Sequence, residues 1–165
     1  MPIRPATPAD VPALAALYAD VVRTVGPAHY DAAQVDAWAA FADEPRFRRF
    51  VLDPHTFVSE DESGITGFAG LADDGHVTAL YVRADRMRQG IGSALLRAVV
   101  ERAEERGVAR LYTEASAFSR PVFERHGFRL DAVEVVERRG ATFERYLMVR
   151  DLGTGSAPES ARQGV

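Results

Sequence analysis

The chain has no cysteine, which excludes a disulfide framework, a thiol nucleophile and a cysteine-ligated metal site. No apolar run approaches the length of a membrane span, and no signal-peptide core is found in the first residues, MPIRPATPADVPAL. Basic residues are not in excess, because 20 lysines and arginines stand against 24 aspartates and glutamates. A nucleic-acid-binding face requires such an excess. We therefore expect a cytoplasmic protein without a nucleic-acid or membrane partner and without a metal.

The composition is typical of one soluble globular domain. The 165 residues are enough to bury a sizeable core, and 47% of them are hydrophobic and 27% charged. The last residues, from Gly153, read GTGSAPESARQGV. A segment so rich in glycine, serine and proline buries too little apolar surface to offset the entropy of ordering. We expect a single domain over residues 1–151 and a disordered tail over residues 152–165.

Hydrophobic periodicity and turn signals predict alternating strands and helices. Thr7 with Asp10, and Asp31 with Gln34, have the spacing of boxes that cap helix starts. The predicted strands cover 2–6, 56–59, 65–71, 76–82, 111–114, 128–137 and 142–149, and the predicted helices cover 7–24, 31–41, 45–52, 91–107 and 121–127. This order is typical of an α/β protein whose sheet contains one central parallel pair.

The most informative segment, from Ala79 to Leu96, reads ALYVRADRMRQGIGSALL. A strand-like stretch stops at Val82, and a Gly-Ile-Gly turn then opens a helix. The first amides of a helix lack partners and carry the positive end of its dipole, so they attract anions. Gly90 and Gly92 have no Cβ, which lets a phosphate approach the main chain closely. We expect this turn to bind a cofactor that carries a diphosphate.

Two sequence blocks carry a resemblance to a known family. The segment lacks the spacing of the nucleotide P-loop and of the dinucleotide fingerprint. Arg88 to Leu96 instead resembles the acetyl-CoA loop of GNAT-type N-acetyltransferases, and Pro121 to Phe128 is similar to the later helix-turn-strand element of that family. Both blocks stand in the right order, and the resemblance covers about residues 3–149. It implies a GNAT fold, with a twisted, mostly antiparallel sheet, a splayed central parallel pair and flanking helices.

The resemblance also implies acetyl-CoA as co-substrate and assigns residues to it. Main-chain groups of one strand would bind the pantetheine arm, namely those of Leu80, Tyr81 and Val82. The glycine turn would bind the pyrophosphate through Arg88, Gln89, Gly90, Ile91, Gly92 and Ser93. Two later side chains, Ser116 and Phe123, would also contact CoA. Met87 departs from the family pattern, which has glutamine or arginine there. Arg86 or Arg88 would replace that polar partner, or the partner is absent from this chain. Phe123 stands where the family usually has a tyrosine that protonates the thiolate, so Ser119, Tyr112 or water would take that role.

Acetyl transfer requires that an amine lose a proton before it attacks the thioester. His76 is the first candidate base, because strand periodicity places it on the face of Thr78, Leu80 and Val82, and histidine titrates near neutrality. Glu114 at the end of the neighbouring strand is the second candidate. An exposed, non-catalytic position is an open alternative for both.

The acceptor pocket is expected between the first two helices and the last two strands. Tyr30 and Trp38 are its candidate substrate contacts, with His29 and Phe41 nearby. Trp38 and Phe41 lie three residues apart on one helix face, which favours plain core packing as their alternative role. The turn from Arg138 to Gly140 is a candidate contact for an acidic acceptor or for a second subunit in a homodimer. We expect an N-acetyltransferase for a small-molecule or peptide amine. The alternatives are a non-catalytic acyl-CoA sensor and a protein lysine or N-terminal acetyltransferase.

Overall fold

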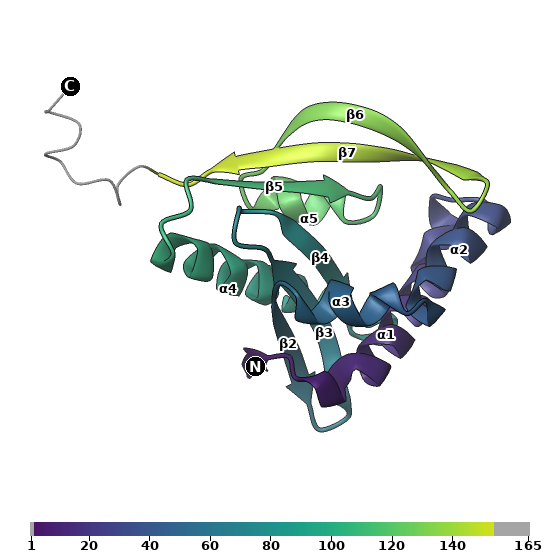
Figure 1. Ribbon diagram of the computed structural model, residues 1–165, viewed down its shortest axis with the longest axis horizontal. Helices are drawn as coiled ribbons and strands as arrows, with labels where there is room; N and C mark the ends of the chain where they lie inside the picture. The colour runs from purple at the N-terminus through teal and green to yellow at the C-terminus, as the bar shows by residue number, and fades with distance from the viewer. Residues whose placement is uncertain (1, 154–165) are drawn as a thin grey trace, which may run out of the picture.

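The structure is a computed structural model that describes residues 2–153. Its strands form two antiparallel sheets that diverge from a common edge (Figure 1). The first sheet contains β1 (Ile3–Pro5), β2 (His55–Asp61), β3 (Gly64–Leu71) and β4 (Val77–Val82) in that order, and the second has the order β5 (Arg110–Ala115), β7 (Ala141–Asp151) and β6 (Arg129–Arg138). The mixed α/β fold expected from the sequence is confirmed.

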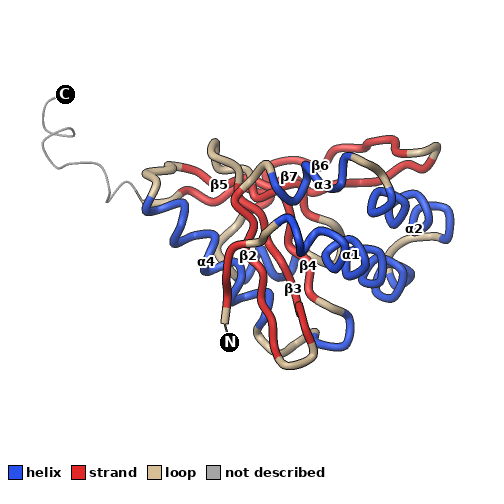
Figure 2. Tube along the Cα trace, turned by 60° about the horizontal axis from the view of Figure 1, so that its bottom comes forward, coloured by secondary structure: helices blue, strands red, loops and turns tan. Residues whose placement is uncertain are grey.

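The helices lie in two groups on opposite faces of the first sheet (Figure 2). The N-terminal group consists of η1 (Pro8–Asp10), α1 (Val11–Val25), η2 (Gly26–Ala28), α2 (Ala32–Ala39), η3 (Ala40–Asp43) and α3 (Arg46–Leu52). The second group consists of η4 (Ala84–Arg86), α4 (Ile91–Glu105) and α5 (Arg120–Arg125). Phe68 is buried under α1 and α3, whereas the next residue, Ala69, is buried under α4. Both faces of β3 are therefore covered, which explains why this strand is apolar along its length.

One of the two predicted capping boxes is complete. The Asp31 side chain accepts from the Gln34 amide at 2.8 Å, and the Gln34 side chain accepts from the Asp31 amide at 2.9 Å. At the first helix, the Asp10 carboxylate accepts from the Thr7 amide at 2.7 Å, and the Thr7 hydroxyl also donates to it. That helix therefore opens with the short 3₁₀ turn η1 before α1 begins.

The parallel strands β4 and β5 meet at one end only. His76 forms an isolated parallel bridge with Tyr112, and the Thr113 hydroxyl donates to the Val77 carbonyl at 2.8 Å. Gly75 permits this approach, because a Cβ there would lie 2.2 Å from the Arg110 carbonyl oxygen. Past this point, within residues 2–153, β4 pairs only with β3 and β5 only with β7. The strands are thus splayed as predicted, and main-chain groups of β4 face the gap.

A β-bulge changes which side chains of β4 share a face. Gly70 pairs with Ala79 but Leu71 pairs with Val77, so Thr78 is an additional residue in β4. The alternation of side chains shifts at such a bulge. Val77 accordingly packs in the α4 cluster, whereas Ala79 packs in the α1 cluster.

The bulge overturns one prediction about His76. Leu80 and Val82 pack on the α4 side of the sheet with Val77, and Tyr81 packs on the α1 side. Because His76 precedes the bulge, its side chain lies on the face opposite Leu80 and Val82. The prediction placed His76 on the same face as Leu80 and Val82 because it assumed strict alternation of side chains along the strand. It was wrong because the inserted residue of a bulge shifts that alternation.

The packed domain reaches one residue into the predicted tail. Leu152 is buried, and its amide donates to the Ala109 carbonyl at 2.9 Å. Residues 154–165, which make up most of the predicted disordered segment, lie outside the described residues.

Candidate active site

The turn between β4 and α4 presents unpaired amides. Arg88 and Gly90 adopt positive φ angles of 64° and 80°, and Gly90 is the residue that precedes α4. Within residues 2–153, no acceptor receives a hydrogen bond from the amides of Arg88 to Ser93, and the first paired amide is that of Ala94, which donates to Gly90. These amides and the dipole of the 15-residue helix α4 create positive potential at this turn.

Only one arginine of this turn keeps a free charge. Arg83 pairs with Asp85 at 2.6 Å, and Arg86 pairs with Asp61 at 3.0 Å, whereas Arg88 has no acidic partner within residues 2–153. The hydrogen bond with Asp61 also raises the pKa of Arg86. Arg88 is therefore the better candidate to replace the family residue at Met87, whose side chain is 38% exposed.

The beginning of α4 is joined to the end of α5. His126, which follows α5, has its Nε2 atom 2.9 Å from the Ser93 hydroxyl. Gly92 lies between these helices, where an added Cβ would be 3.5 Å from Val82 and 3.8 Å from Val122. The predicted pyrophosphate residues Gln89 to Ser93 thus line one continuous turn with α5 as its neighbour.

The two predicted CoA contacts after β5 have different environments. Phe123 is only 2% exposed and packs edge-to-face on Phe128, with ring centroids 5.0 Å apart. Its contact with pantetheine stays a prediction. Ser116 lies at the end of β5, and its hydroxyl donates to that of Ser119 at 2.9 Å. The hydroxyls of Ser116 and Ser119 therefore provide polar atoms just after β5, whereas the Phe123 side chain is apolar.

The two candidate bases lie against each other. His76 Nε2 is 2.5 Å from Glu114 Oε2, and this hydrogen bond is the main cause that lowers the pKa of Glu114. The His76 ring stacks on Tyr112, with centroids 4.8 Å apart and planes at 4°. Tyr112 in turn donates to Asp74 at 2.5 Å, a bond that raises its pKa to about 12. The Tyr112 proton is therefore engaged with Asp74 rather than available to a thiolate.

A cavity of about 440 Å³ lies beside the end of β5. Its walls come from the first helices and the β6–β7 hairpin, where the acceptor pocket is expected, and from the end of β5. They include six aromatic residues beside eight charged ones, and the aromatic residues are Tyr18, Tyr30, Trp38, Phe41, Phe50 and Phe143. Glu114 and Ser116 line it, whereas His76 and His29 do not. Glu114 is thus the member of the His76–Glu114 pair that faces the cavity.

Hydrogen bonds hold the β6–β7 hairpin to the N-terminal helices beside the cavity. Arg139 in the hairpin turn donates to Glu44 at 2.7 Å, and the Gln34 side chain donates to the Thr142 carbonyl at 2.6 Å. Arg46 also binds Glu44, at 2.6 Å. The turn that was a candidate contact for an acceptor or a second subunit therefore has Arg139 bound within its own chain.

The Tyr30 hydroxyl reaches the end of β5. It accepts a hydrogen bond from the Ala117 amide at 2.9 Å, and burial raises its pKa. Trp38 packs edge-to-face on Tyr30 and stacks on Phe118, with centroids 5.2 Å apart. Both predicted substrate contacts thus line the cavity, and Trp38 also has the packing role that was its alternative. The contributions of Tyr18, Glu44 and Phe143 were missed, because no local sequence signal relates these distant residues.

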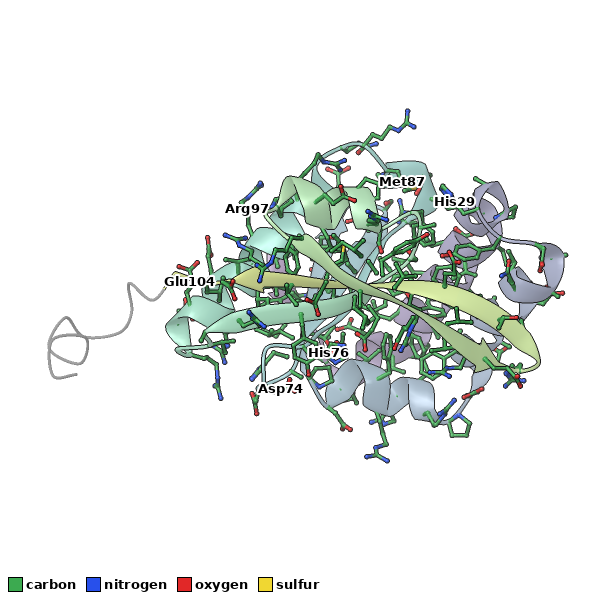
Figure 3. All side chains as sticks on the ribbon, turned by 90° about the horizontal axis from the view of Figure 1, so that it is seen from above. His29, Asp74, His76, Met87, Arg97 and Glu104 are labelled. Atoms are coloured by element: carbon green, nitrogen blue, oxygen red, sulfur yellow. The ribbon has the colours of Figure 1, made fainter. Side chains whose placement is uncertain are left out.

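Figure 3 shows the molecule from above. His76 and Asp74 lie together at one side, and Met87 of the glycine turn lies at the other. Within the described residues, no three histidine, aspartate or glutamate side chains gather as a metal site. No helix of residues 2–153 has both the length and the hydropathy required to cross a bilayer.

Comparisons with known proteins agree with this geometry. A family model described as an acetyltransferase (GNAT) domain matches residues 27–149. The uncharacterized N-acetyltransferase YafP of Escherichia coli K12 is 30% identical over 146 residues, which cover 88% of this chain and 93% of that protein. A GCN5-related N-acetyltransferase from Rhodopseudomonas palustris superposes with a TM-score of 0.88 at 26% identity, covering 92% of this chain and 95% of the other. PaiA N-acetyltransferase from Thermoplasma acidophilum, solved with coenzyme A, has a TM-score of 0.76 at 12% identity, covering 92% and 98%.

Proposed function

The chain belongs to the GNAT acetyltransferase family, and from this premise we propose that it transfers the acetyl group of acetyl-CoA directly to a primary amine of a small molecule or peptide in the cytoplasm. The observation that carries the proposal is the row of unpaired amides from Arg88 to Ser93 beside the gap between β4 and β5. A cofactor diphosphate on these amides allows its pantetheine arm to enter the gap along Leu80 to Val82.

The acceptor amine enters from the aromatic cavity. Glu114 provides a carboxylate in that cavity, and His76 is bonded to one of its oxygens. In the proposed reaction, Glu114 binds the ammonium group and His76 takes up its proton through this hydrogen bond. The neutral amine then attacks the thioester carbonyl carbon, while an amide at the end of β4 stabilises the developing oxyanion.

Breakage of the carbon–sulfur bond leaves the CoA thiolate, which must gain a proton, while the new amide nitrogen must lose one. The proton released by the nitrogen balances the one that the sulfur takes up. Phe123 cannot supply it, and the Tyr112 hydroxyl is bound to Asp74. The Tyr30 hydroxyl accepts from the Ala117 amide, so its own proton points elsewhere, and Tyr30 lines the cavity beside the end of β5. We assign Tyr30 as the proton donor in preference to Ser119, whose hydroxyl is engaged with Ser116.

The test is thiol release from acetyl-CoA across a panel of primary amines that includes amino acids, polyamines and short peptides. We expect release that depends on the amine and on Glu114, so Glu114→Gln should abolish most turnover. Glu104→Gln is the matched control, because Glu104 is exposed near the far end of α4 (Figure 3).

The same assay separates the alternatives. An acyl-CoA sensor would bind CoA but release no thiol with any amine, and the buried Phe123 is the feature that favours it. A protein acetyltransferase would work only with peptides. The ribosomal-protein-alanine N-acetyltransferase of Brucella melitensis, 25% identical over 92% of this chain, supports including N-terminal alanine peptides in the panel.

A further inference from the structure

Asp74, which lies beside His76 (Figure 3), bonds both partners of an aromatic stack at the start of β4. Its Oδ2 atom accepts from the Tyr112 hydroxyl at 2.5 Å, and its Oδ1 atom accepts from the His76 amide at 3.1 Å. The bond from Tyr112 is also the main cause that lowers the pKa of Asp74. One carboxylate in the turn between β3 and β4 thus connects the main chain of His76 to a side chain of β5.

The main chain fixes the same two residues next to each other. The Tyr112 amide donates to the Gly75 carbonyl at 3.1 Å, and the His76 carbonyl accepts from the Ala72 amide at 2.8 Å. The rings of His76 and Tyr112 consequently lie almost parallel, with planes at 4° and centroids 4.8 Å apart. We name Asp74 and Tyr112 the Asp74–Tyr112 clamp, because together they bond the backbone of His76 and cover one face of its ring.

The clamp leaves the edge of the His76 ring directed at Glu114. His76 Nε2 lies 2.5 Å from Glu114 Oε2, and the His76 side chain is 29% exposed. A side chain with that much open space can adopt other rotamers unless its neighbours hold it. Of the described residues, Glu114 lines the acceptor cavity, whereas Asp74 and Tyr112 do not. An effect of the clamp on an acceptor in the cavity would therefore act through His76 and Glu114.

We propose that Asp74 and Tyr112 are positioning residues that hold the His76 ring against Glu114 during proton uptake. This inference rests on the proposed function, in which Glu114 binds the ammonium group and His76 takes up its proton. Glu114 gains and loses contacts with each acceptor that enters, so the position of His76 depends on the residues behind it. Misplacement of a reacting group by about 1 Å can cost about 100-fold in rate. The clamp also gives Tyr112 a role other than proton donation to the thiolate.

Tyr112→Leu tests the clamp, because it removes both the stacked ring and the bond to Asp74. We expect kcat for amine-dependent thiol release to fall about tenfold, with unchanged KM for the amine and unchanged acetyl-CoA affinity. Tyr112→Phe keeps the ring and loses only the hydroxyl, so it should lose less activity than Tyr112→Leu. Asp74→Ala should resemble Tyr112→Phe. Asp73→Ala is its matched control, because Asp73 in the same turn pairs instead with His55 at 3.3 Å and Arg106 at 3.5 Å.

A double-mutant cycle with His76→Ala separates positioning from a general loss of structure. If Tyr112 acts through His76, Tyr112→Leu should lower kcat no further in the His76→Ala background. A purely structural role would lower kcat in both backgrounds. NMR of the imidazole signals, in a chain with four histidines, gives a readout that needs no turnover. The His76 signals, assigned by their loss in His76→Ala, should shift in Asp74→Ala, which leaves the Tyr112 ring in the chain, and should stay in place in Asp73→Ala.

The outcomes separate this inference from the function on which it rests. Wild-type kcat in Tyr112→Leu, or an equal loss in both backgrounds, would overturn the clamp and leave acetyl transfer intact. Wild-type kcat in His76→Ala would remove His76 from the reaction and the clamp with it, while Glu114 would remain the base. If the wild type releases no thiol with any amine, the proposed function fails first and this inference fails with it.

Discussion

The proposed cofactor side and the proposed acceptor side of this molecule are built by different means. On the cofactor side, α4 buries a regular aliphatic stripe, from Leu95 to Ala103, and presents main-chain amides at its start. On the acceptor side, the short helices α2 and α3 and two 3₁₀ turns surround a cavity with aromatic side chains. The first side offers a site made of backbone, and the second offers a site made of side chains.

Because of this difference, we expect the two sides to tolerate different amino-acid substitutions. A backbone site is insensitive to most side-chain changes but fails when bulk or charge reaches the amides. A side-chain site loses function stepwise, because each aromatic or charged group contributes its own contact. The two halves meet at the end of β5, where Glu114 and the Tyr30 hydroxyl face one cavity. Mutations on either side of that meeting point should therefore separate cofactor binding from turnover.

Gly92→Asp should have the largest effect, because it breaks the backbone site itself. The new carboxylate would lie beside the amides proposed to bind the diphosphate. Repulsion between this carboxylate and a phosphate costs several kcal/mol, or about 100-fold or more in affinity. Calorimetry should show no measurable acetyl-CoA binding. Gly92→Ala is the steric control, because an added Cβ meets only ordinary contacts in the folded chain. Unchanged affinity in folded Gly92→Asp would remove the diphosphate from this turn.

His76→Ala should lower turnover about 10²-fold, as for loss of a general base, with little change in acetyl-CoA affinity. Steady-state kinetics combined with calorimetry measures both quantities. His55→Ala is the matched control, because His55 at the start of β2 contacts Asp73 rather than the cavity. Near-full turnover in His76→Ala would leave Glu114 as the sole base.

The pH profile of the same variant reports on the His76–Glu114 pair. Because the His76 hydrogen bond lowers the pKa of Glu114 from its ordinary 4.5, the wild-type acid limb should lie below pH 4.5. Removing His76 should move that limb upward, toward 4.5. By linkage, the stability that the pair contributes is present above pH 4.5 and is lost as the pH falls through the lowered pKa. An acid limb at the same pH in both proteins would mean that Glu114 does not control activity.

Tyr30→Phe should lower kcat about tenfold at unchanged acetyl-CoA affinity. The effect is smaller than for a missing base because a thiol is acidic enough for the CoA thiolate to leave partly without protonation by an acid. The variant keeps the aromatic contact with Trp38 and removes only the hydroxyl that accepts from Ala117. Thermal unfolding shows whether that bond is structural. A lowered melting temperature with unchanged kcat would assign Tyr30 to packing alone.

The cofactor side could be predicted from the sequence because its signals are local. The strand end at Val82, the two glycines and the stripe of α4 lie within one continuous segment, and the structure places them as expected. The acceptor side could be located but not described in detail. Arg139 and Glu44 are 95 residues apart, and Gln34 and Thr142 are 108 apart, so no periodicity relates them. The bulge at Thr78 was equally hidden, because an inserted residue leaves no mark on composition.

Arg139→Ala should have the smallest effect and act only on the acceptor side. It removes the bond from the hairpin turn to Glu44, while Gln34 still holds the hairpin to α2. Exposed ion pairs contribute little to stability, so the melting temperature should barely change. The cavity wall should nevertheless loosen, and KM for the amine should rise about two- to threefold, since a looser wall positions the substrate less well.

Arg138→Ala is the paired control for this measurement, because within residues 2–153 the Arg138 side chain bonds only the Glu137 carbonyl of its own strand. The two variants differ by one position in the same turn and remove the same charge. If both raise KM equally, net charge at the cavity entrance governs amine binding, and the bond to Glu44 has no part in it. If only Arg139→Ala raises KM while acetyl-CoA affinity stays constant, the acceptor side is assembled by long-range side-chain bonds, independently of the cofactor side.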